Sequence, residues 1–245
     1  MARRAVVTGA ASGIGRAVAA RLERDGAQVL AVDLEPDPDG PGEPFAADLT
    51  TRAGNRDAVA AALVRFGGLD TVIPNAGFQH VASVEEFPED RWDAMIALLL
   101  TSPFLLARAA WPALRESGDG RFVAIASVHG LVASPFKSAY VSAKHGVLGL
   151  VKTLALEGAD QGVVATAVCP GYVRTPLVEN QVADQARAHG MDEDRVLEEV
   201  ILGPHAVKRL IEPDEVADVV AFLLTPAGRT FTGSAVTMDQ GWSAR

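Results

Sequence analysis

Tyr140 and Lys144 are the first residues whose types and spacing could do chemistry. They lie four residues apart in SAYVSAKHGV, residues 138–147, where the alanines and the apolar residues that follow predict a helix. Positions i and i+4 share one helix face, so the phenol and the ammonium would be neighbours. Because a nearby positive charge favours the phenolate, we expect the pKa of Tyr140 to lie below its usual value of about 10. Such a phenol can act as a general acid or base.

A serine strengthens this interpretation over its alternative, a surface tyrosine beside a solvated lysine. Ser127 ends a β-rich run, in the stretch IASVHG, thirteen residues before Tyr140. A serine hydroxyl can hold and polarise a substrate oxygen while the phenol takes or gives its proton, and the ammonium of Lys144 can also bind a ribose. We expect the three side chains to converge on one substrate oxygen, in position to transfer a proton to or from it.

The composition limits the classes of function. The chain has 245 residues, of which 49% are hydrophobic, and this is enough for one domain with a full core. Its net charge of −9 and the lack of a basic stripe argue against a nucleic-acid partner. The single cysteine, Cys169, excludes an intramolecular disulfide and fits a reducing compartment. No signal sequence precedes the first strand, and the apolar segment 94–111 is interrupted by polar residues and a proline, so we expect a cytoplasmic protein without a membrane span.

The elements that must position these residues alternate along the chain. We predict strands at 5–8, 28–33, 70–74, 122–127, 163–169 and 235–238, helices near 13–25, 52–66, 88–115, 138–158 and 213–224, and a polar loop at 35–44. Alternation of strands and helices implies right-handed crossovers and a doubly wound α/β fold, in which both faces of a parallel sheet are covered. Ligands of such folds bind at the carboxyl ends of the strands.

A glycine-rich turn, TGAASGIG, follows the first predicted strand and opens the first helix. Gly9, Gly13 and Gly15 permit a tight turn, close approach of the backbone to a pyrophosphate, and close packing of the helix. The spacing G-x-x-x-G-x-G is not the usual dinucleotide fingerprint, so the position between strand and helix carries the prediction.

Three further strand ends could contact a dinucleotide. Asp33 ends the second predicted strand, where a carboxylate can accept hydrogen bonds from a ribose diol and repels a 2′-phosphate. We therefore predict NAD rather than NADP. Asp48 could reach the adenine edge, and Asn75-Ala76-Gly77 lets the backbone approach the cofactor. The alternative for each of them is an ordinary turn residue.

Taken in order, these features resemble the short-chain dehydrogenase/reductase family over essentially the whole chain. The matching marks are TGAASGIG, Asp33, Asp48-Leu49, Asn75-Ala76-Gly77, Ser127, Tyr140-x-x-x-Lys144 and PGYVRTP at 170–176. The resemblance implies a single Rossmann-like domain, no metal site, assembly as a homotetramer through helices 88–115 and 138–158, and Ser127, Tyr140 and Lys144 as catalytic residues. The cofactor contacts that it implies are Gly9, Ser12, Gly13, Ile14, Gly15, Asp33, Asp48, Leu49, Asn75, Ala76, Gly77, Tyr140, Lys144, Pro170, Gly171, Val173 and Thr175.

Residues 77–88, 127–147 and 169–181 look like the corresponding parts of D-3-hydroxybutyrate dehydrogenases. The resemblance implies NAD-dependent interconversion of (R)-3-hydroxybutyrate and acetoacetate, with the substrate held by Gln79, Ser127, His129, Lys137, Tyr140 and Gln181. A lysine with neutral hydrogen-bond donors suits the carboxylate of a small hydroxy acid. The alternatives are a structural histidine, a solvated lysine and ordinary polar glutamines. Trp242, near the C-terminus, could approach the pocket or simply pack.

Residues 177–206 form a charged insertion that we interpret as an exposed helical pair serving as a substrate lid, with a plain surface hairpin as the alternative.

Leu99 departs from the family, which normally carries an asparagine at this position. In the family that asparagine supports a backbone carbonyl that holds a water, and the water links the lysine to solvent in a proton relay. Pro103 has no N–H to bond the carbonyl four residues earlier, so we hypothesise that it leaves the Leu99 carbonyl free for that water. Two rival functions stay open: a reductase of acyl-thioester or other ketones, and a weakly catalytic NAD-binding regulator.

Overall fold

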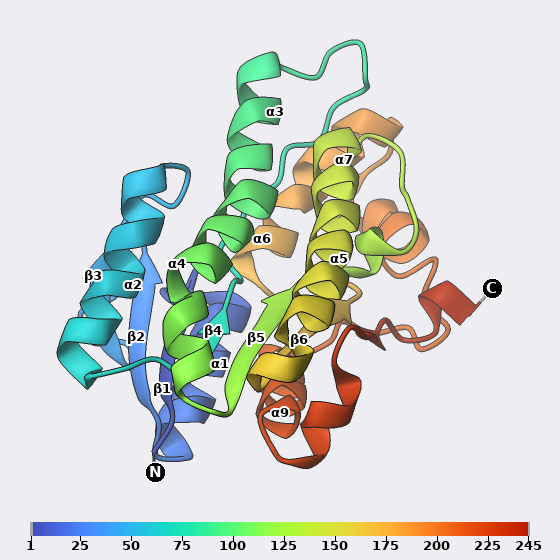
Figure 1. Ribbon diagram of the computed structural model, residues 1–245. Coiled ribbons are helices and arrows are strands. Elements are labelled where there is room, and N and C mark those ends of the chain that lie inside the picture. The colour runs from blue at the N-terminus through green and yellow to red at the C-terminus, as the bar shows by residue number, and fades with distance from the viewer. Residues whose placement is uncertain (1, 245) are drawn as a thin grey trace.

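The computed structural model describes residues 2–244 and has a seven-stranded parallel sheet at its centre (Figure 1). The strands are β1 (Arg4–Thr8), β2 (Gln28–Asp33), β3 (Glu43–Ala46), β4 (Thr71–Ile73), β5 (Gly120–Ile125), β6 (Val163–Pro170) and β7 (Ala235–Met238). Their order across the sheet is β3-β2-β1-β4-β5-β6-β7, and every neighbouring pair is parallel. The predicted doubly wound α/β fold is confirmed.

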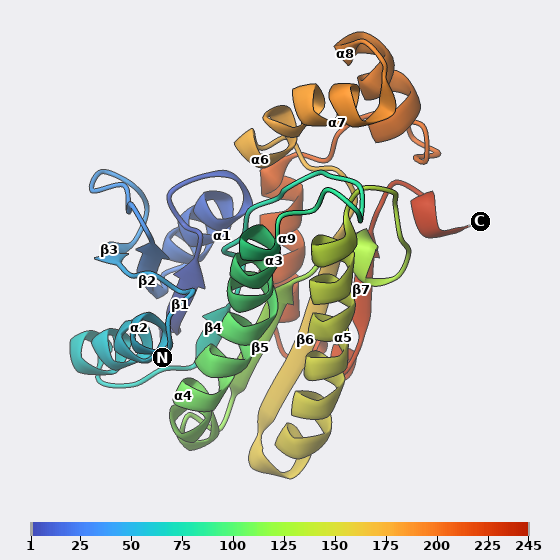
Figure 2. The ribbon, with the colours of Figure 1, turned by 90° about the horizontal axis from the view of Figure 1, so that it is seen from above.

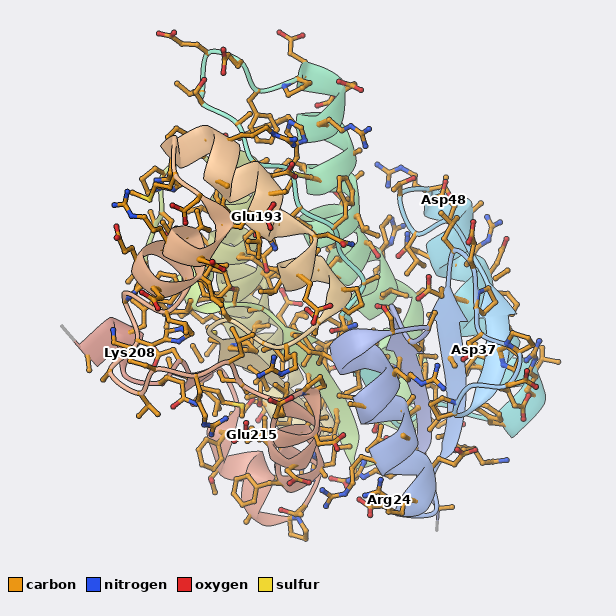
Figure 3. All side chains as sticks on the ribbon, turned by 180° about the vertical axis from the view of Figure 1, so that it is seen from behind. Arg24, Asp37, Asp48, Glu193, Lys208 and Glu215 are labelled. Atoms are coloured by element: carbon orange, nitrogen blue, oxygen red, sulfur yellow. The ribbon has the colours of Figure 1, made fainter. Side chains whose placement is uncertain are left out.

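Helices cover both faces of this sheet. They are α1 (Gly13–Arg24), α2 (Arg52–Phe66), α3 (Glu89–Ile96), α4 (Ser102–Glu116), α5 (Ser138–Gly158), α6 (Pro176–Glu179), α7 (Gln181–His189), α8 (Glu193–Arg195) and α9 (Pro213–Leu223). Figure 1 shows α2, α4 and α5 in front of the sheet, and Figure 3 shows α1 and α9 side by side behind it. Because successive strand residues point to opposite faces, β1 gives Val6 to the front core and Val7 to the rear core.

Strand β3 is missing from the strands predicted from sequence, and Glu43 and Pro44 fall in the stretch predicted as a polar loop. That prediction is wrong for these two residues. The strand lies at the edge of the sheet beside β2, and most of its residues are exposed. An edge strand needs neither an apolar run nor an N–H on both sides, so it tolerates a proline and leaves a weak pattern.

The predicted helix 88–115 is interrupted by a π-helical segment, Ala97–Thr101, between α3 and α4. The Ser102 N–H donates to the Ala97 carbonyl five residues earlier, and Pro103 follows without an N–H of its own. The helical stretch Glu89–Glu116 is long enough to cross a membrane and contains an 18-residue window with a mean hydropathy of 1.6. Their inner face nevertheless packs against the sheet and α2, so this is a core helix of the domain.

Helices α6, α7 and α8 lie together near the carboxyl ends of the strands (Figure 2). Apart from Pro176, which starts α6, they belong to the insertion 177–206, which also contains a π-helical segment, Val196–Ile201. The insertion was predicted to be an exposed pair of helices, yet it buries Val196 and Ile201 in a small core of its own with Tyr172. The apolar residues that looked scattered in the sequence are therefore the inner face of a packed unit.

Candidate active site

The ends of β5 and the start of α5 bring the three predicted catalytic residues to one cavity of about 100 Å³. Ser127 follows β5 and caps a 3-10 turn, Val128–Gly130, with its hydroxyl oxygen accepting the His129 N–H at 3.1 Å. Tyr140 and Lys144 lie one turn apart near the start of α5 and line the same cavity. The spacing along the sequence thus predicted a real convergence.

The pKa of Tyr140 differs from the sequence-based expectation. Burial raises it to about 12, and the hydroxyl of Ser127 acts in the opposite direction. Burial also lowers the pKa of Lys144 to about 8. The Lys144 ammonium lies 5.5 Å from the centre of the Tyr140 ring and donates to the Ile125 carbonyl at 2.8 Å. The prediction that the lysine lowers the phenol pKa is wrong for this state, because desolvation of the phenol outweighs its neighbour.

A second, smaller cavity of about 10 Å³ adjoins Lys144 and has room for one water molecule. Leu98, Leu99 and Pro103 line it together with Lys144. Since Pro103 has no N–H, it can give neither an α-type hydrogen bond to the Leu99 carbonyl nor a π-type bond to the Leu98 carbonyl. Two carbonyls that Pro103 cannot bond therefore belong to residues that line this cavity together with Lys144, and the relay itself stays a hypothesis.

A groove of about 410 Å³ runs from the first strand end to the catalytic cavity. The predicted cofactor residues that line it are Gly9, Ser12, Gly13, Ile14, Asp33, Asp48, Leu49, Asn75, Ala76, Gly77 and Thr175. Those that line the neighbouring catalytic cavity instead are Tyr140, Lys144, Pro170, Gly171 and Val173. Gly15 lines neither, because it packs beneath the turn, where a Cβ would collide with the Gly9 carbonyl oxygen.

The groove fits a dinucleotide in three respects. Gly9 and Gly13 have positive φ angles of 66° and 52°, so the backbone turns tightly where a side chain would be strained. Ser12 makes no side-chain capping hydrogen bond to α1, and the first turn of α1 has no acidic residue. The N–H groups of that turn are thus available to a pyrophosphate.

The Asp33 carboxylate lines the groove and is fixed by the backbone around it. It accepts hydrogen bonds from the N–H groups of Ala11 at 3.0 Å and Leu34 at 2.8 Å. The alternative of a turn residue is therefore correct in part, because Asp33 ties β2 to the glycine-rich turn. Its side chain nevertheless lines the ligand groove, where its charge would repel a phosphate group placed directly beside it.

The four residues predicted to bind a substrate carboxylate all line the catalytic cavity. Lys137 is only 2% exposed, and its Nζ donates to the Tyr172 hydroxyl at 2.9 Å and to Gln181 Oε1 at 3.3 Å. Gln79 Nε2 donates to the same Gln181 oxygen at 3.2 Å. The alternative of a solvated lysine is excluded. Burial lowers the pKa of Lys137 to about 7.

His129 is buried beside these residues and stays neutral. Burial lowers its pKa to about 3, and the charge of Lys137 acts in the same direction. Its Nε2 lies 3.0 Å from the Ser134 hydroxyl oxygen, and its ring makes an edge contact with that of Tyr140, with centroids 5.9 Å apart. A neutral imidazole can donate one hydrogen bond and adds no charge to the site.

Two aromatic residues complete the cavity. Trp242 lines it and also stacks on Tyr172, with ring centroids 5.6 Å apart and an interplanar angle of 16°, so both alternatives for this tryptophan hold. Tyr172 was missed as a site residue, although it stands inside the segment PGYVRTP that marks the family. Its partner Lys137 lies 35 residues earlier, so no local pattern connects the two. Within residues 2–244, no cluster of three or more His, Cys, Asp or Glu side chains could hold a metal ion.

Comparisons with known proteins agree with this geometry. A family model described as enoyl-(acyl carrier protein) reductase matches residues 9–243. The D-beta-hydroxybutyrate dehydrogenase of Rhizobium meliloti (strain 1021) is 43% identical over 258 residues, with 100% of both chains covered. The uncharacterized oxidoreductase YxjF of Bacillus subtilis (strain 168) is 42% identical, with 98% of both chains covered. The ligand-free aldohexose dehydrogenase of Thermoplasma acidophilum has a TM-score of 0.90 at 29% identity, covering 100% of this chain and 95% of its own. The chain therefore belongs to the short-chain dehydrogenase/reductase family, whose oxidoreductases use NAD or NADP.

Proposed function

We propose that the protein is an NAD-dependent dehydrogenase that interconverts (R)-3-hydroxybutyrate and acetoacetate. The observation that carries the proposal is a buried lysine, Lys137, in the same small cavity as Ser127 and Tyr140. A substrate for this cavity must be small, must carry a hydroxyl or keto oxygen, and must offer a negative charge to Lys137. A four-carbon 3-hydroxy acid meets all three requirements.

The charge argument rests on the partners of Lys137. Its hydrogen bonds go to two neutral groups, the Tyr172 hydroxyl and the Gln181 amide oxygen. Within residues 2–244, no carboxylate pairs with it, and no acidic residue lines the cavity. A buried ammonium without a counter-charge is costly, which is why its pKa is lowered. A substrate carboxylate would supply the missing charge and would be held by it.

The chemistry of the proposed reaction follows from the same residues. When bound, the oxidised dinucleotide supplies the hydride acceptor and a positive charge beside the phenol. The Ser127 hydroxyl holds the substrate oxygen, and Tyr140 takes its proton as the general base. In the reverse direction Tyr140 starts protonated, as its raised pKa favours, and donates to the keto oxygen. Lys137 and the neighbouring amides hold the carboxylate, which fixes the position of C3.

The proposal extends to cofactor, lid, assembly and location. Asp33 in the groove supports NAD over NADP, because its carboxylate would repel a 2′-phosphate. Leu177, Val178 and Gln181 of the insertion line the cavity, which supports a lid that excludes water. A homotetramer through helices 88–115 and 138–158 is supported by exposed apolar side chains such as those of Phe104 and Leu156. The acidic composition supports a cytoplasmic enzyme without nucleic-acid or membrane partners.

The test is NADH formation by the purified protein with (R)-3-hydroxybutyrate, its (S) enantiomer and a 3-hydroxybutyryl thioester. We expect turnover of the (R) acid at least tenfold faster than that of the other two. A preference for the thioester would favour the rival reductase. Normal NAD binding without turnover of any of the three would favour the regulator, for which Leu99 in place of the family asparagine is the supporting observation.

A further inference from the structure

We propose that the Tyr172 hydroxyl is a direct ligand of the substrate carboxylate and sets the preference for acids over neutral substrates. The proposal rests on the function proposed above, since it concerns the same cavity. Tyr172 lines that cavity and is 6% exposed. Within residues 2–244, no hydrogen bond joins the Tyr172 side chain to Ser127, Tyr140 or Lys144.

The direction of the hydrogen bond between Lys137 and Tyr172 carries the argument. A lysine ammonium has three hydrogens and no lone pair, so in its protonated form it can only donate. The Tyr172 oxygen, 2.9 Å away, is therefore the acceptor of this bond. The hydrogen of the phenol must point elsewhere, and within residues 2–244 no hydrogen bond donated by the Tyr172 hydroxyl is present.

The ring of Tyr172 is held so that this free donor stays at the carboxylate site. One face stacks on Trp242, and the edge of His129 contacts the ring at a centroid distance of 6.3 Å. The Lys137 Nζ also lies 4.9 Å from the ring centre. Burial raises the pKa of Tyr172, so the hydroxyl keeps its hydrogen over the working range of the enzyme.

Two donors this close can serve one carboxylate together. The ammonium of Lys137 would bond one oxygen of the substrate and the phenol of Tyr172 the other, as in bidentate recognition. The nearby amide oxygen of Gln181 does not compete for the phenol, because it already accepts from Lys137 and from Gln79. An ester or a neutral ketone offers weaker acceptors at this position and gains much less from the phenol.

The experiment compares (R)-3-hydroxybutyrate with its methyl ester in the wild type and in Tyr172→Phe, which keeps the stacked ring and removes the hydroxyl. With saturating NAD, we expect kcat/KM for the acid to fall roughly 10- to 100-fold, mainly through KM, as for loss of a hydrogen bond to a charged group. The value for the ester should change less than about twofold. Tyr172→Leu, which also lacks the donor, should reproduce the loss for the acid if Tyr172→Phe proves unstable.

Val178→Ala is the matched control, because Val178 lines the same cavity and packs in the same small core as Tyr172, yet its side chain has no hydrogen-bond donor. Its effect should be similar for acid and ester. Equal losses for both substrates in Tyr172→Phe would show that Tyr172 only packs, and would overturn the inference while leaving the proposed function intact. A wild type that does not prefer the acid over the ester would instead overturn the proposed function, and this inference with it.

Discussion

Replacing Lys137 by methionine tests the proposed substrate through its charge. Methionine keeps an unbranched chain of similar length but cannot carry a proton, so the substitution removes the ammonium with little change of volume. Lys137 contacts Tyr172 and Gln181 and lies outside the nucleotide groove. We therefore expect NAD affinity to be unchanged, while the use of 3-hydroxybutyrate falls sharply.

The loss of kcat/KM in Lys137→Met should depend on pH, because burial lowers the pKa of the lysine into the range of the assay. Below neutral pH the lysine is protonated, and losing a buried charge partner costs about 2–4 kcal/mol, or roughly 30- to 1,000-fold in kcat/KM. The pKa of Lys137 is lowered to about 7, so above this pH the free wild-type enzyme loses the charge that binds the substrate. The wild-type advantage should then shrink by about tenfold for each further pH unit. Two titratable neighbours do not change charge in this range: His129 is neutral, and Tyr172 keeps its proton because burial raises its pKa.

The assay is the ratio of kcat/KM between wild type and Lys137→Met for (R)-3-hydroxybutyrate, measured from pH 6 to pH 9 with saturating NAD. The ionisation of Tyr140 affects both proteins alike and cancels in the ratio. We expect the ratio to be constant below about pH 6.5 and then to fall towards one, by at most roughly 100-fold at pH 9. A ratio near one at pH 6 would place the carboxylate site elsewhere. A large ratio that stays constant to pH 9 would refute the lowered pKa.

Stability gives an independent check on the same lysine. The folded-state pKa of about 7 lies below the ordinary value of 10.5, so between these values the unfolded chain binds the proton that the folded chain has released. Burying the charged lysine therefore lowers the free energy of unfolding most below about pH 7. This cost disappears as the pH rises towards 10.5. Lys137→Met should unfold at a higher temperature than the wild type at pH 6, with a smaller difference at pH 9. An equal or lower unfolding temperature at pH 6 would contradict the cost of the buried charge.

Three further predictions concern the cofactor, the relay and the turn. The wild type should use NAD at least roughly tenfold more efficiently than NADP, and Asp33→Ala should narrow this gap; equal efficiency in the wild type would exclude the proposed role of Asp33. Pro103→Ala restores an N–H beside the small cavity and should lower kcat by less than the ~10²–10⁴-fold of a whole acid/base group. If the wild type is inactive at every pH tested and Leu99→Asn is active, the hypothesis that Pro103 frees a carbonyl for the relay water is refuted. Gly15→Ala should weaken NAD binding and lower the unfolding temperature, because its Cβ would meet the Gly9 carbonyl; melting and NAD titration at wild-type values would disprove this packing.

The fold and the residues that line the site could be predicted from sequence, because both follow from the order in which strands, helices and motifs occur along the chain. Strand and helix patterns alternate strongly, and the carboxyl ends of parallel strands share one edge, so Ser127 and Tyr140 had to converge. The pKa of Tyr140 could not be predicted, since a sequence shows the neighbouring lysine but not the depth of burial that outweighs it. The contact of Lys137 with Tyr172 could not be predicted either, because it joins two segments, 35 residues apart, that only the folded chain brings together.

Under the proposed function, Gln181 makes the insertion a part of the substrate site. This residue begins α7, donates to the Leu177 carbonyl at 2.7 Å, and accepts hydrogen bonds from both Gln79 and Lys137. A lid that opens by moving α7 must break the last two of these bonds and let water reach the groups left behind. The motion that releases product would then also break the hydrogen bonds that hold the carboxylate site together. The proposed function therefore predicts that affinity and turnover are linked, so that substitutions that tighten the hold on the carboxylate slow the escape of product.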